Sequence, residues 1–367
     1  MHGSVQIQFK EYIHMNIWEA ILQGIVQGFT EFLPVSSSGH VSLVQHFLGK
    51  NIEGAQAFTL FLHFGTLAAV FVVYRQIIWD LIVELCATIK DGAHDLWGLI
   101  RYGKGKFKPN ASWKLTEMNE TRRMGMLIIV SCMCAILLFV PVFGFLGLTT
   151  ASGEEVKTMT DLSQYTSEDS DIIVEGLCLL VTGFLLLYAT NAANRRRSTG
   201  DITDGEVTLK TAIIMGIGQC FATLPGLSRS GTTTSLGMIH RADKNKALQF
   251  SFIMGIPAVL AGNVLEIATM TDEQWDKFEV LPVLIGVIFA AVVGILSIFG
   301  LRWIVSNNKL NYFGYYCLAM GALVIIIAII EKTTGCGNAV PAAELLGEVT
   351  STDVSAADLV ASLADVA

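Results

Sequence analysis

The chain has 367 residues, of which 52% are hydrophobic and only 15% are charged, and its mean hydropathy is +0.55. Soluble domains carry about 25% charged residues, so this balance excludes an ordinary soluble protein and indicates a polytopic membrane protein. The formal net charge of -8 is divided unevenly, because basic and acidic residues gather in different loops. Such basic loops are typical of topology signals, and we expect no nucleic-acid partner.

Apolar runs long enough to cross a bilayer, at about 20 residues each, recur along the chain. They lie near residues 57–74, 124–148, 172–190, 247–270, 280–301 and 312–330. We therefore predict a multi-pass protein of the plasma membrane. The first 15 residues have no apolar core before a small-residue cleavage site, so we expect no cleaved signal peptide.

The charges of the loops predict how these runs are oriented. Basic residues gather between 75 and 123, at 195–197, and at 302 and 309, whereas the loops 150–171 and 272–279 are acidic. Because positively charged loops stay in the cytoplasm, the basic connections are predicted to lie inside and the acidic loops outside. Residues 75–122 are expected to form amphipathic helices at the interface, with four apolar side chains facing lipid: Ile77, Ile78, Leu81 and Ile82.

Two polar strings, 27–40 and 224–233, interrupt the apolar pattern. Each follows a helix-like stretch, 17–32 or 208–224, that breaks at a Leu-Pro pair and resumes after a cluster of serine and glycine. Backbone that is not helical is tolerated at membrane depth only where it faces protein or water. We therefore predict two re-entrant helix pairs, the first entering from outside and the second from the cytoplasm.

The two strings resemble each other in sequence. A shift of 192 positions pairs identical residues: Gly24 with Gly216, Gln27 with Gln219, Ser36 with Ser228, Ser38 with Ser230 and Gly39 with Gly231. Each half, 16–190 and 208–331, then holds one re-entrant pair and three spans, an odd number that inserts the halves in opposite orientations. The predicted fold is an all-α polytopic membrane protein with an inverted-topology repeat, about six full transmembrane helices and two re-entrant helix pairs. One membrane domain, 16–331, is flanked by an N-terminal segment, 1–15, and by an acidic, disordered or loosely helical tail, 332–367.

The helix before the first break carries a polar face. Gln27 and Glu31 are four residues apart and therefore share one side of the helix. Glu31 lies next to the break at Pro34, and a carboxylate this deep is a candidate for metal coordination or proton transfer. His63, within a predicted span, is an equal candidate for lining a pore and for packing in the core.

Three serines follow the break, and a histidine opens the next helix. Serine is among the best helix caps, so one of Ser36, Ser37 and Ser38 is expected to cap that helix. The start of a helix also offers free N–H groups to an anion. One hydroxyl is a candidate nucleophile, and His40 is a candidate base or phosphate-orienting group.

The second string repeats this design around an arginine. A guanidinium matches the geometry of a phosphate with two hydrogen bonds and stays charged at any relevant pH. Near the midplane, Arg229 needs a counter-anion, and a phosphate or the carboxylate of the first string would serve. Together the two strings are suited to phosphoryl transfer, in which catalysis is mostly positioning and charge stabilisation.

These residues resemble the undecaprenyl-diphosphatase family, the bacitracin-resistance type of membrane phosphatase. The family pattern Glu/Gln-x-x-x-Glu is similar to Gln27 to Glu31, and Phe-Leu-Pro-Val-Ser-Ser-x-Gly-His is similar to Phe32 to His40. Pro-Gly-x-Ser-Arg-Ser-x-x-Thr matches the second string from residue 225 to residue 233. The likeness covers about residues 16–331. It implies hydrolysis of undecaprenyl diphosphate to the monophosphate, which recycles the lipid carrier for cell-wall synthesis, and dependence on a divalent metal such as Mg²⁺ or Ca²⁺.

The resemblance also implies roles for single residues. By analogy, Ser37 is the candidate nucleophile and His40 its partner, although which of the two attacks stays open. Glu31 is a metal ligand or an acid/base carboxylate, and Arg229 clamps the diphosphate. The residues expected to bind substrate are Gln27, Ser36, Ser38, Gly226, Ser228, Ser230 and Thr233.

Two other functions compete with this interpretation. A transporter or flippase for a polyprenyl phosphate or another anion is the alternative, because an inverted repeat with a midplane site also suits transport. A phosphatidic-acid-type phosphatase also uses a Ser-Gly-His string, but its further basic motif and His-x-x-x-Asp partner do not occur here at sensible spacing. The expected partners are the polyprenyl diphosphate and membrane lipids, and a homodimer is left open. On the predicted topology, the active site opens to the external face.

Overall fold

The structure is a computed structural model that describes residues 16–47, 52–102, 113–144, 148–149, 155–168, 172–200, 205–270 and 280–334. Within these residues the fold is helical, and β-structure is limited to two isolated bridges. The predicted N-terminal segment and residues 335–367 of the predicted tail lie outside the described residues. The all-α prediction is confirmed for the described part of the chain.

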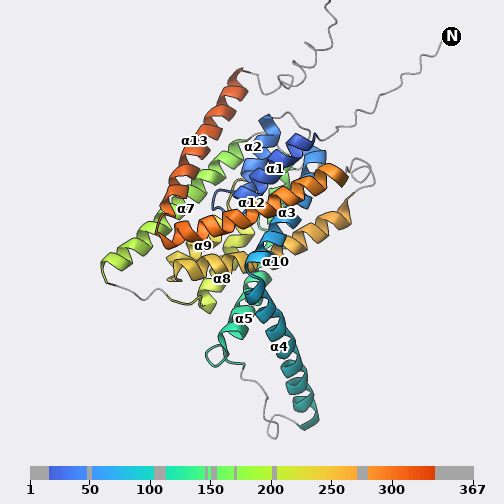
Figure 1. The fold of residues 1–367 in the computed structure, drawn as a ribbon, viewed down its shortest axis with the longest axis vertical. Coiled ribbons are helices and arrows are strands. Elements are labelled where there is room, and N and C mark those ends of the chain that lie inside the picture. Colours follow the sequence, from blue (N-terminus) through green and yellow to red (C-terminus); the bar gives the residue numbers. More distant parts are fainter. Residues whose placement is uncertain are drawn as a thin grey trace, which may run out of the picture.

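The helices follow one another along the chain as drawn in Figure 1. They are α1 (Ile17–Thr30), α2 (Ser37–Phe47), α3 (Ile52–Val73), α4 (Arg75–Tyr102), α5 (Glu120–Met133), the 3-10 helix η1 (Cys134–Phe139), α6 (Met159–Glu168), α7 (Ile173–Ser198), α8 (Leu209–Phe221), α9 (Arg229–Ile239), α10 (Lys244–Thr269), α12 (Val280–Ser306) and α13 (Asn311–Thr334).

In the part of the chain that the structure describes, five helical segments are long and apolar enough to cross a membrane: 120–139, 173–198, 244–269, 280–306 and 311–334. A sixth candidate is the pair formed by 58–73 and 75–101, which bends by 86°. The chain is therefore a multi-pass membrane protein. Every one of the predicted spans overlaps one of these segments.

The predicted span 124–148 differs from the structure at its C-terminal end. Helix α5 gives way to η1, which ends at Phe139, and Val140 is extended (φ −76°, ψ 124°). The following residue is Pro141. A proline disfavours helical backbone at the residue before it and lacks an N–H of its own, so the helix cannot continue to residue 148.

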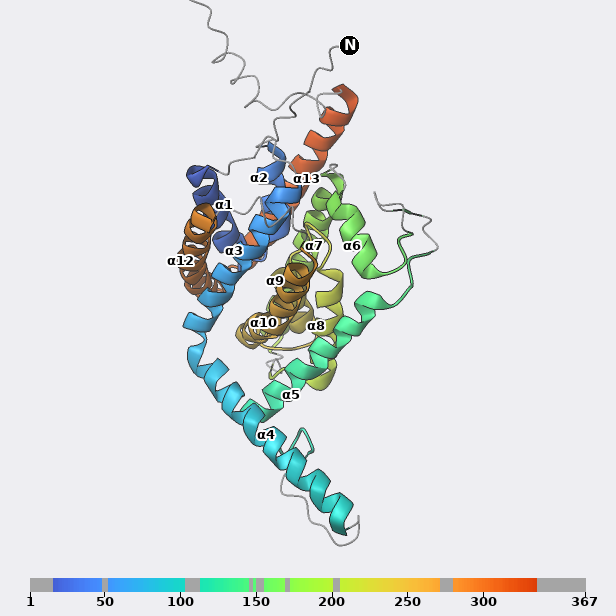
Figure 2. The same ribbon diagram turned by 90° about the vertical axis from the view of Figure 1, so that its right-hand side faces the viewer.

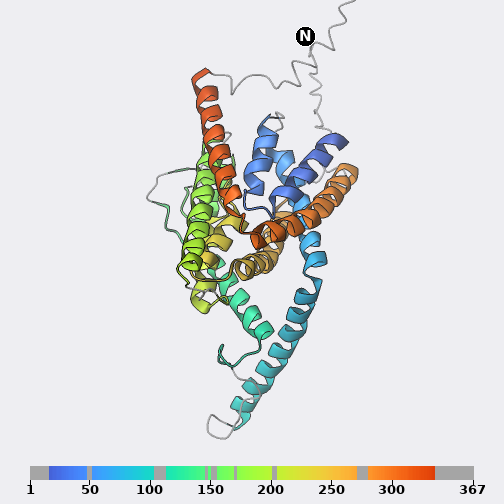
Figure 3. The same cartoon turned by 60° about the vertical axis from the view of Figure 1, so that its left-hand side comes forward.

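The bend after α3 starts a long helix rather than several short ones. Helix α4 runs for 28 residues, and its C-terminal end projects away from the other helices, whereas α5 returns to pack on α8 and α10 (Figures 2 and 3). Ile82 is exposed, as predicted, but Ile78 is buried within the main hydrophobic core. The prediction that Ile78 faces lipid is wrong, because it lies in the first turn after the bend, where α4 still packs near α5.

The short helices that flank the polar strings are α1, α2, α8 and α9, with 14, 11, 13 and 11 residues. At 1.5 Å per residue each is about 16–21 Å long, too short to cross a hydrocarbon core of about 30 Å. Helix α1 packs along α12, which also packs along α3, while α8 packs on α5 and η1. Helix α9, which follows the second polar string, packs on α7, α8 and α10.

Candidate functional site

The first polar turn lies between α1 and α2. Glu31 caps the C-terminal end of α1, and its N–H donates to the carbonyl of Gln27 at 2.9 Å. Pro34 prevents the helix from continuing. Ser36 takes a left-handed backbone (φ 70°), and its Oγ accepts the N–H of Gly39 at 3.2 Å. The predicted serine cap is therefore Ser36.

The second polar turn, between α8 and α9, has the same local design. Ser228 is the N-cap of α9, and its Oγ accepts the N–H of Gly231 at 3.1 Å. Gly226 has a φ of 86°, and a Cβ at this position would lie 2.5 Å from the backbone oxygen of Glu175. Only glycine fits there, so the turn packs directly on helix α7.

The two turns contact each other. A Cβ on Gly39 would lie 3.0 Å from the Cα of Gly226, so the backbones of the two turns nearly touch. The Oγ of Ser230 donates to the carbonyl of Leu33 at 3.3 Å. Residues from the two polar strings are thus held in one place, although the strings lie far apart in the sequence.

Glu31 is the centre of this junction. Its carboxylate forms an ion pair with Arg229, 198 residues away, and the side chains are 7% and 25% exposed. The other carboxylate oxygen accepts from Ser37 Oγ at 2.6 Å and from Gln27 Nε2 at 3.0 Å. A second nitrogen of Arg229 donates to the carbonyl of Gly255 at 3.3 Å. Four predicted site residues therefore converge: a carboxylate, a cation, a hydroxyl and an amide.

His63 also reaches this cluster. Its Nε2 lies 3.8 Å from Glu31, while its Nδ1 bonds to the carbonyl of Thr59 at 2.9 Å, which fixes the ring. The sequence alone left this histidine evenly balanced between pore and core. One feature of the sequence favoured a role in the site: no other histidine or charged residue occurs between 57 and 74.

His40 lies beside the junction and faces a different partner. Its Nδ1 bonds to the carbonyl of Ser36 at 2.8 Å, and its Nε2 bonds to the hydroxyl of Tyr316 at 2.7 Å. The two rings are stacked, with centroids 5.7 Å apart. In this structure Ser37 donates to Glu31, and His40 makes its bonds elsewhere. The predicted partnership between Ser37 and His40 stays a prediction.

The remaining predicted binding residues mostly support the turns. Thr233 is buried and bonds to Ser251 at 2.6 Å and to the carbonyl of Arg229 at 2.8 Å. Ser228 and Ser230 lie 3.4 Å apart, hydroxyl to hydroxyl. Ser38 is exposed, and its hydroxyl lies 3.2 Å from that of the cap Ser36.

The donor atoms at the junction bear on the predicted metal. In the part of the chain that the structure describes, no three histidine, cysteine, aspartate or glutamate side chains converge on one point. Gln27 Oε1 is buried and accepts no hydrogen bond, which calls for a partner. This oxygen and the Glu31 carboxylate are ligands that Mg²⁺ and Ca²⁺ take, and Mg²⁺ is commonly held by one or two carboxylates plus substrate phosphates. The residues therefore fit an ion held largely by the substrate.

Comparison with known proteins gives this geometry a context. Residues 20–323 match the family model "Bacitracin resistance protein BacA". The chain belongs to the BacA family. Among its relatives is the undecaprenyl-diphosphatase of Alkaliphilus metalliredigens, 33% identical over 316 residues, which are 86% of this chain and 100% of the relative. The undecaprenyl-diphosphatase of Methanobrevibacter smithii is 34% identical over 86% of this chain and 99% of its own length.

A third relative, from Halothermothrix orenii, carries the same enzyme name and is 30% identical over 314 residues. The resemblance inferred from the motifs is confirmed. In the BacA family protein described here, the matched region includes both polar turns and runs from residue 20 within α1 to residue 323, about half-way along α13.

Proposed function

We propose that this chain hydrolyses undecaprenyl diphosphate to undecaprenyl phosphate and inorganic phosphate, and so recycles the lipid carrier of cell-wall synthesis. It is an integral membrane hydrolase of the BacA family, and its relatives over full length are named undecaprenyl-diphosphatases. The observation that carries the proposal is the junction of Glu31, Ser37 and Arg229 from the two polar turns. The junction joins a polarised hydroxyl to a cation suited to phosphate.

In this proposal Arg229 binds the diphosphate. A guanidinium has five N–H donors, and within the described residues Arg229 makes side-chain hydrogen bonds to Glu31 and to the carbonyl of Gly255. The other donors suit phosphate oxygens, and the positive charge stabilises the charge that builds up during transfer. The bond to Gly255 on helix α10 fixes where the guanidinium lies.

Ser37 is the proposed nucleophile. Its hydroxyl and the Glu31 carboxylate are 2.6 Å apart, within the range expected for a nucleophile and its base. The Ser37 oxygen bonds to the terminal phosphorus, its proton passes to Glu31, and the bond to the bridging oxygen breaks to release undecaprenyl phosphate. Water then attacks the phosphoserine, and inorganic phosphate leaves as the serine recovers a proton. In such a site a third group orients the base, and here Gln27 and Arg229 orient the Glu31 carboxylate by bonding to it.

A divalent ion, Mg²⁺ or Ca²⁺, fits this proposal as a partner of the substrate. Glu31 and Gln27 Oε1 would hold it together with the diphosphate, and the bound ion supplies neutralisation of phosphate charge. The protein's own residues still provide the hydroxyl, the carboxylate and the guanidinium.

We propose that the scaffold of this site is an inverted repeat that contains two re-entrant helix pairs. Gly24 and Gly216, paired by the 192-residue shift, occupy equivalent contacts: a Cβ on either would lie 2.5 Å from a backbone oxygen, of Gly286 on α12 or of Ser131 on α5. Helices α12 and α5 are the middle spans of the two predicted halves. This correspondence and the two serine caps support a duplicated, inverted scaffold.

The site is proposed to open to the external face, because the basic loops place the other end in the cytoplasm. A single cysteine replacing the exposed Ser38, in a variant without the native cysteines, tests the orientation. Labelling by a membrane-impermeant maleimide in intact cells is expected. Labelling only after the cells are opened would reverse the orientation.

The activity is tested by phosphate release from undecaprenyl diphosphate, with purified wild type beside Ser37→Ala, and with and without EDTA. We expect metal-dependent release that Ser37→Ala lowers by about 10²- to 10³-fold or more, because the nucleophile is lost. Ser38→Ala is the comparison variant: it removes the neighbouring exposed hydroxyl, which can supply a hydrogen bond to substrate but is not the proposed nucleophile, so it should lower release by less than about tenfold. No release by folded wild type with metal present would leave the transporter as the better hypothesis.

A further inference from the structure

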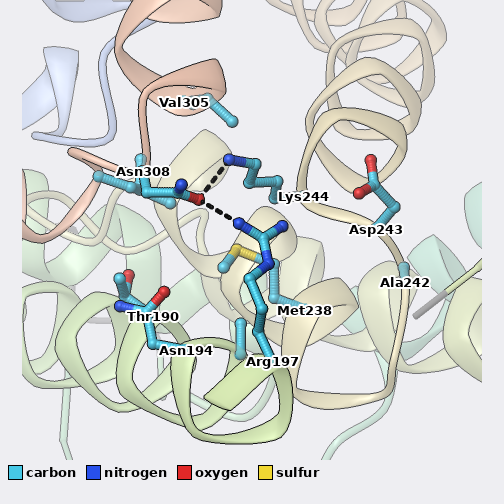
Figure 4. A pocket seen from close by; sticks show the side chains of 11 residues that line it. Thr190, Asn194, Arg197, Met238, Ala242, Asp243, Lys244, Val305 and Asn308 are labelled. Carbon is cyan, nitrogen blue, oxygen red and sulfur yellow. Dashed lines mark hydrogen bonds between the residues drawn. The ribbon is translucent and has the colours of Figure 1, made fainter. Parts of the chain in front are cut away.

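A polar cavity lies at the end of the molecule away from the Glu31 junction. It has a volume of about 130 Å³ and is formed where the C-terminal end of α7, the connection between α9 and α10, and the turn between α12 and α13 meet (Figure 4). A single buried water needs about 10–15 Å³ measured in the same way, so this cavity has room for a group much larger than water.

Two cations converge in this cavity. Arg197 from α7 and Lys244 from α10 both donate to the Oδ1 of Asn308, the arginine at 3.1 Å (Figure 4). Lys244 also donates to the carbonyl of Ser306 at 3.2 Å. Asn308 sits in the turn with a left-handed backbone (φ 57°), which points its amide at the cations. A neutral oxygen thus occupies the place where an anion would balance two charges.

The lining also contains one acidic residue, Asp243. Asp243 accepts the N–H groups of Asn245 and Lys246 as the N-cap of α10, and it lines the same cavity as the two cations (Figure 4). Among the described residues, neither Arg197 nor Lys244 forms an ion pair within 4.0 Å. Two cations, Arg197 and Lys244, and one acid, Asp243, line the cavity, so the lining carries a net charge of +1.

The cavity is connected to the catalytic junction by helix α9. Arg229 begins α9 and Met238, near its other end, lines the cavity, so the two sites are about 14 Å apart along this helix. The surrounding loop ends carry further basic residues: Arg195, Arg196, Arg241, Lys246, Arg302 and Lys309. The positive-inside rule places this end at the cytoplasmic leaflet, which is rich in anionic lipids.

We propose that this cavity binds the phosphate headgroup of an anionic membrane lipid. The phosphate would accept hydrogen bonds from Arg197 and Lys244, the guanidinium binding two oxygens at once and the ammonium acting as a point charge. The apolar side of the lining, with Val305, Leu310 and Met238, suits the adjoining glycerol and acyl carbons. Basic pockets between transmembrane helices on this side of membranes are a recurrent site for such headgroups. The bound lipid would fasten together α7, α10 and the α12–α13 turn.

Native mass spectrometry of the full-length protein released from nanodiscs tests this proposal. The probes are phosphatidylcholine alone and phosphatidylcholine mixed with phosphatidylglycerol. We expect wild type to retain phosphatidylglycerol in preference to phosphatidylcholine, and Arg197→Gln and Lys244→Gln each to weaken that retention about fivefold. Retention that is unchanged in the double variant would overturn the proposal.

Arg195→Gln is the matched control, because it removes a charge from the same end of α7 without touching the cavity. It should retain the lipid like wild type, and an equal loss would show that only the overall surface charge matters. Phosphate release in zwitterionic detergent checks that each variant is folded and active. A further arm measures the melting temperature with inorganic phosphate in place of lipid: stabilisation by phosphate, without retained lipid in the first experiment, would reject a lipid as the ligand.

Discussion

The two polar turns share a backbone design and differ in chemistry. Both are closed by a serine whose Oγ accepts the N–H of a glycine three residues later, at 3.2 Å for Ser36 and 3.1 Å for Ser228. The 192-residue shift that pairs these two serines also pairs Ser37 with Arg229. These two side chains bond to opposite oxygens of the same carboxylate, Glu31.

The comparison teaches how two turns of similar backbone design can build one asymmetric site. Positions matched by the 192-residue shift approach Glu31 from two sides, and one is a hydroxyl while the other is a cation. In the proposed mechanism the nucleophile, Ser37, comes from the first turn and the positive charge, Arg229, comes from the second. A single half of the chain therefore holds an incomplete site.

The largest expected effect comes from separating the charge pair. Glu31→Gln and Arg229→Met should each lower phosphate release by about 10³-fold or more, because the base or the phosphate clamp is lost. Each should also destabilise the protein, by up to about 3–5 kcal/mol, since one charge is left without its partner in a mostly buried place. Initial rates and unfolding in detergent measure the two effects.

The double variant, Glu31→Gln with Arg229→Met, separates charge balance from chemistry. It should recover much of the lost stability and none of the activity. A double variant as unstable as the single ones would mean that the pair does more in packing than in compensating charge. Recovered activity would contradict the division of roles between the turns.

A smaller effect distinguishes the two serine caps. Ser36 has a φ of 70°, whereas Ser228 has a φ of −64°, so alanine is strained only at position 36. Ser36→Ala should be less stable than Ser36→Gly by about 1–2 kcal/mol, since it suffers left-handed strain as well as the lost cap. At position 228 the gap between alanine and glycine should be about 0.5–1 kcal/mol. Thermal unfolding of the four variants measures both gaps, and equal gaps would show that the turns are not distinguished by backbone strain.

The smallest effect is expected at a contact that only the first turn has. The shift of 192 pairs His40 with Thr232, so the bond from His40 to Tyr316 has no histidine counterpart in the second turn. Tyr316→Phe removes one neutral hydrogen bond and should lower kcat less than about tenfold. A loss above a hundredfold in steady-state assays would mean that Tyr316 positions His40 for the reaction. His40→Gln is the control, because it should then lose as much activity as Tyr316→Phe.

Sequence reasoning predicted the part of the site that the repeat encodes. Matching the strings placed Glu31 near Arg229, and helical spacing placed Gln27 beside Glu31. The contacts of His63 and Tyr316 were not predictable, because they depend on how α3 and α13 pack against the turns. A tyrosine near the end of a span is also typical of a membrane interface, which hid its role.

The ends and the packing of the helices were also only partly predictable from the sequence. Apolar length identified the spans, but a count of apolar residues ignores the effect of Pro141, so α5 was predicted too long. The burial of Ile78 depends on the 86° bend before α4, and no periodicity in the sequence specifies such an angle. Local chemistry was predictable from sequence where it repeated, and geometry between helices was not.

The close approach of α1 to α12 also affects how genetic data on this protein will be interpreted. A methyl group on Gly24 would collide with the carbonyl oxygen of Gly286, 2.5 Å away, and backbone cannot move aside as a flexible side chain can. Alanine at position 24 would therefore abolish growth in a complementation screen as completely as a change at Glu31, although Gly24 makes none of the contacts at the junction. Loss-of-function variants along α1 will mark helix assembly as well as chemistry, and measuring protein abundance beside activity will tell the two apart.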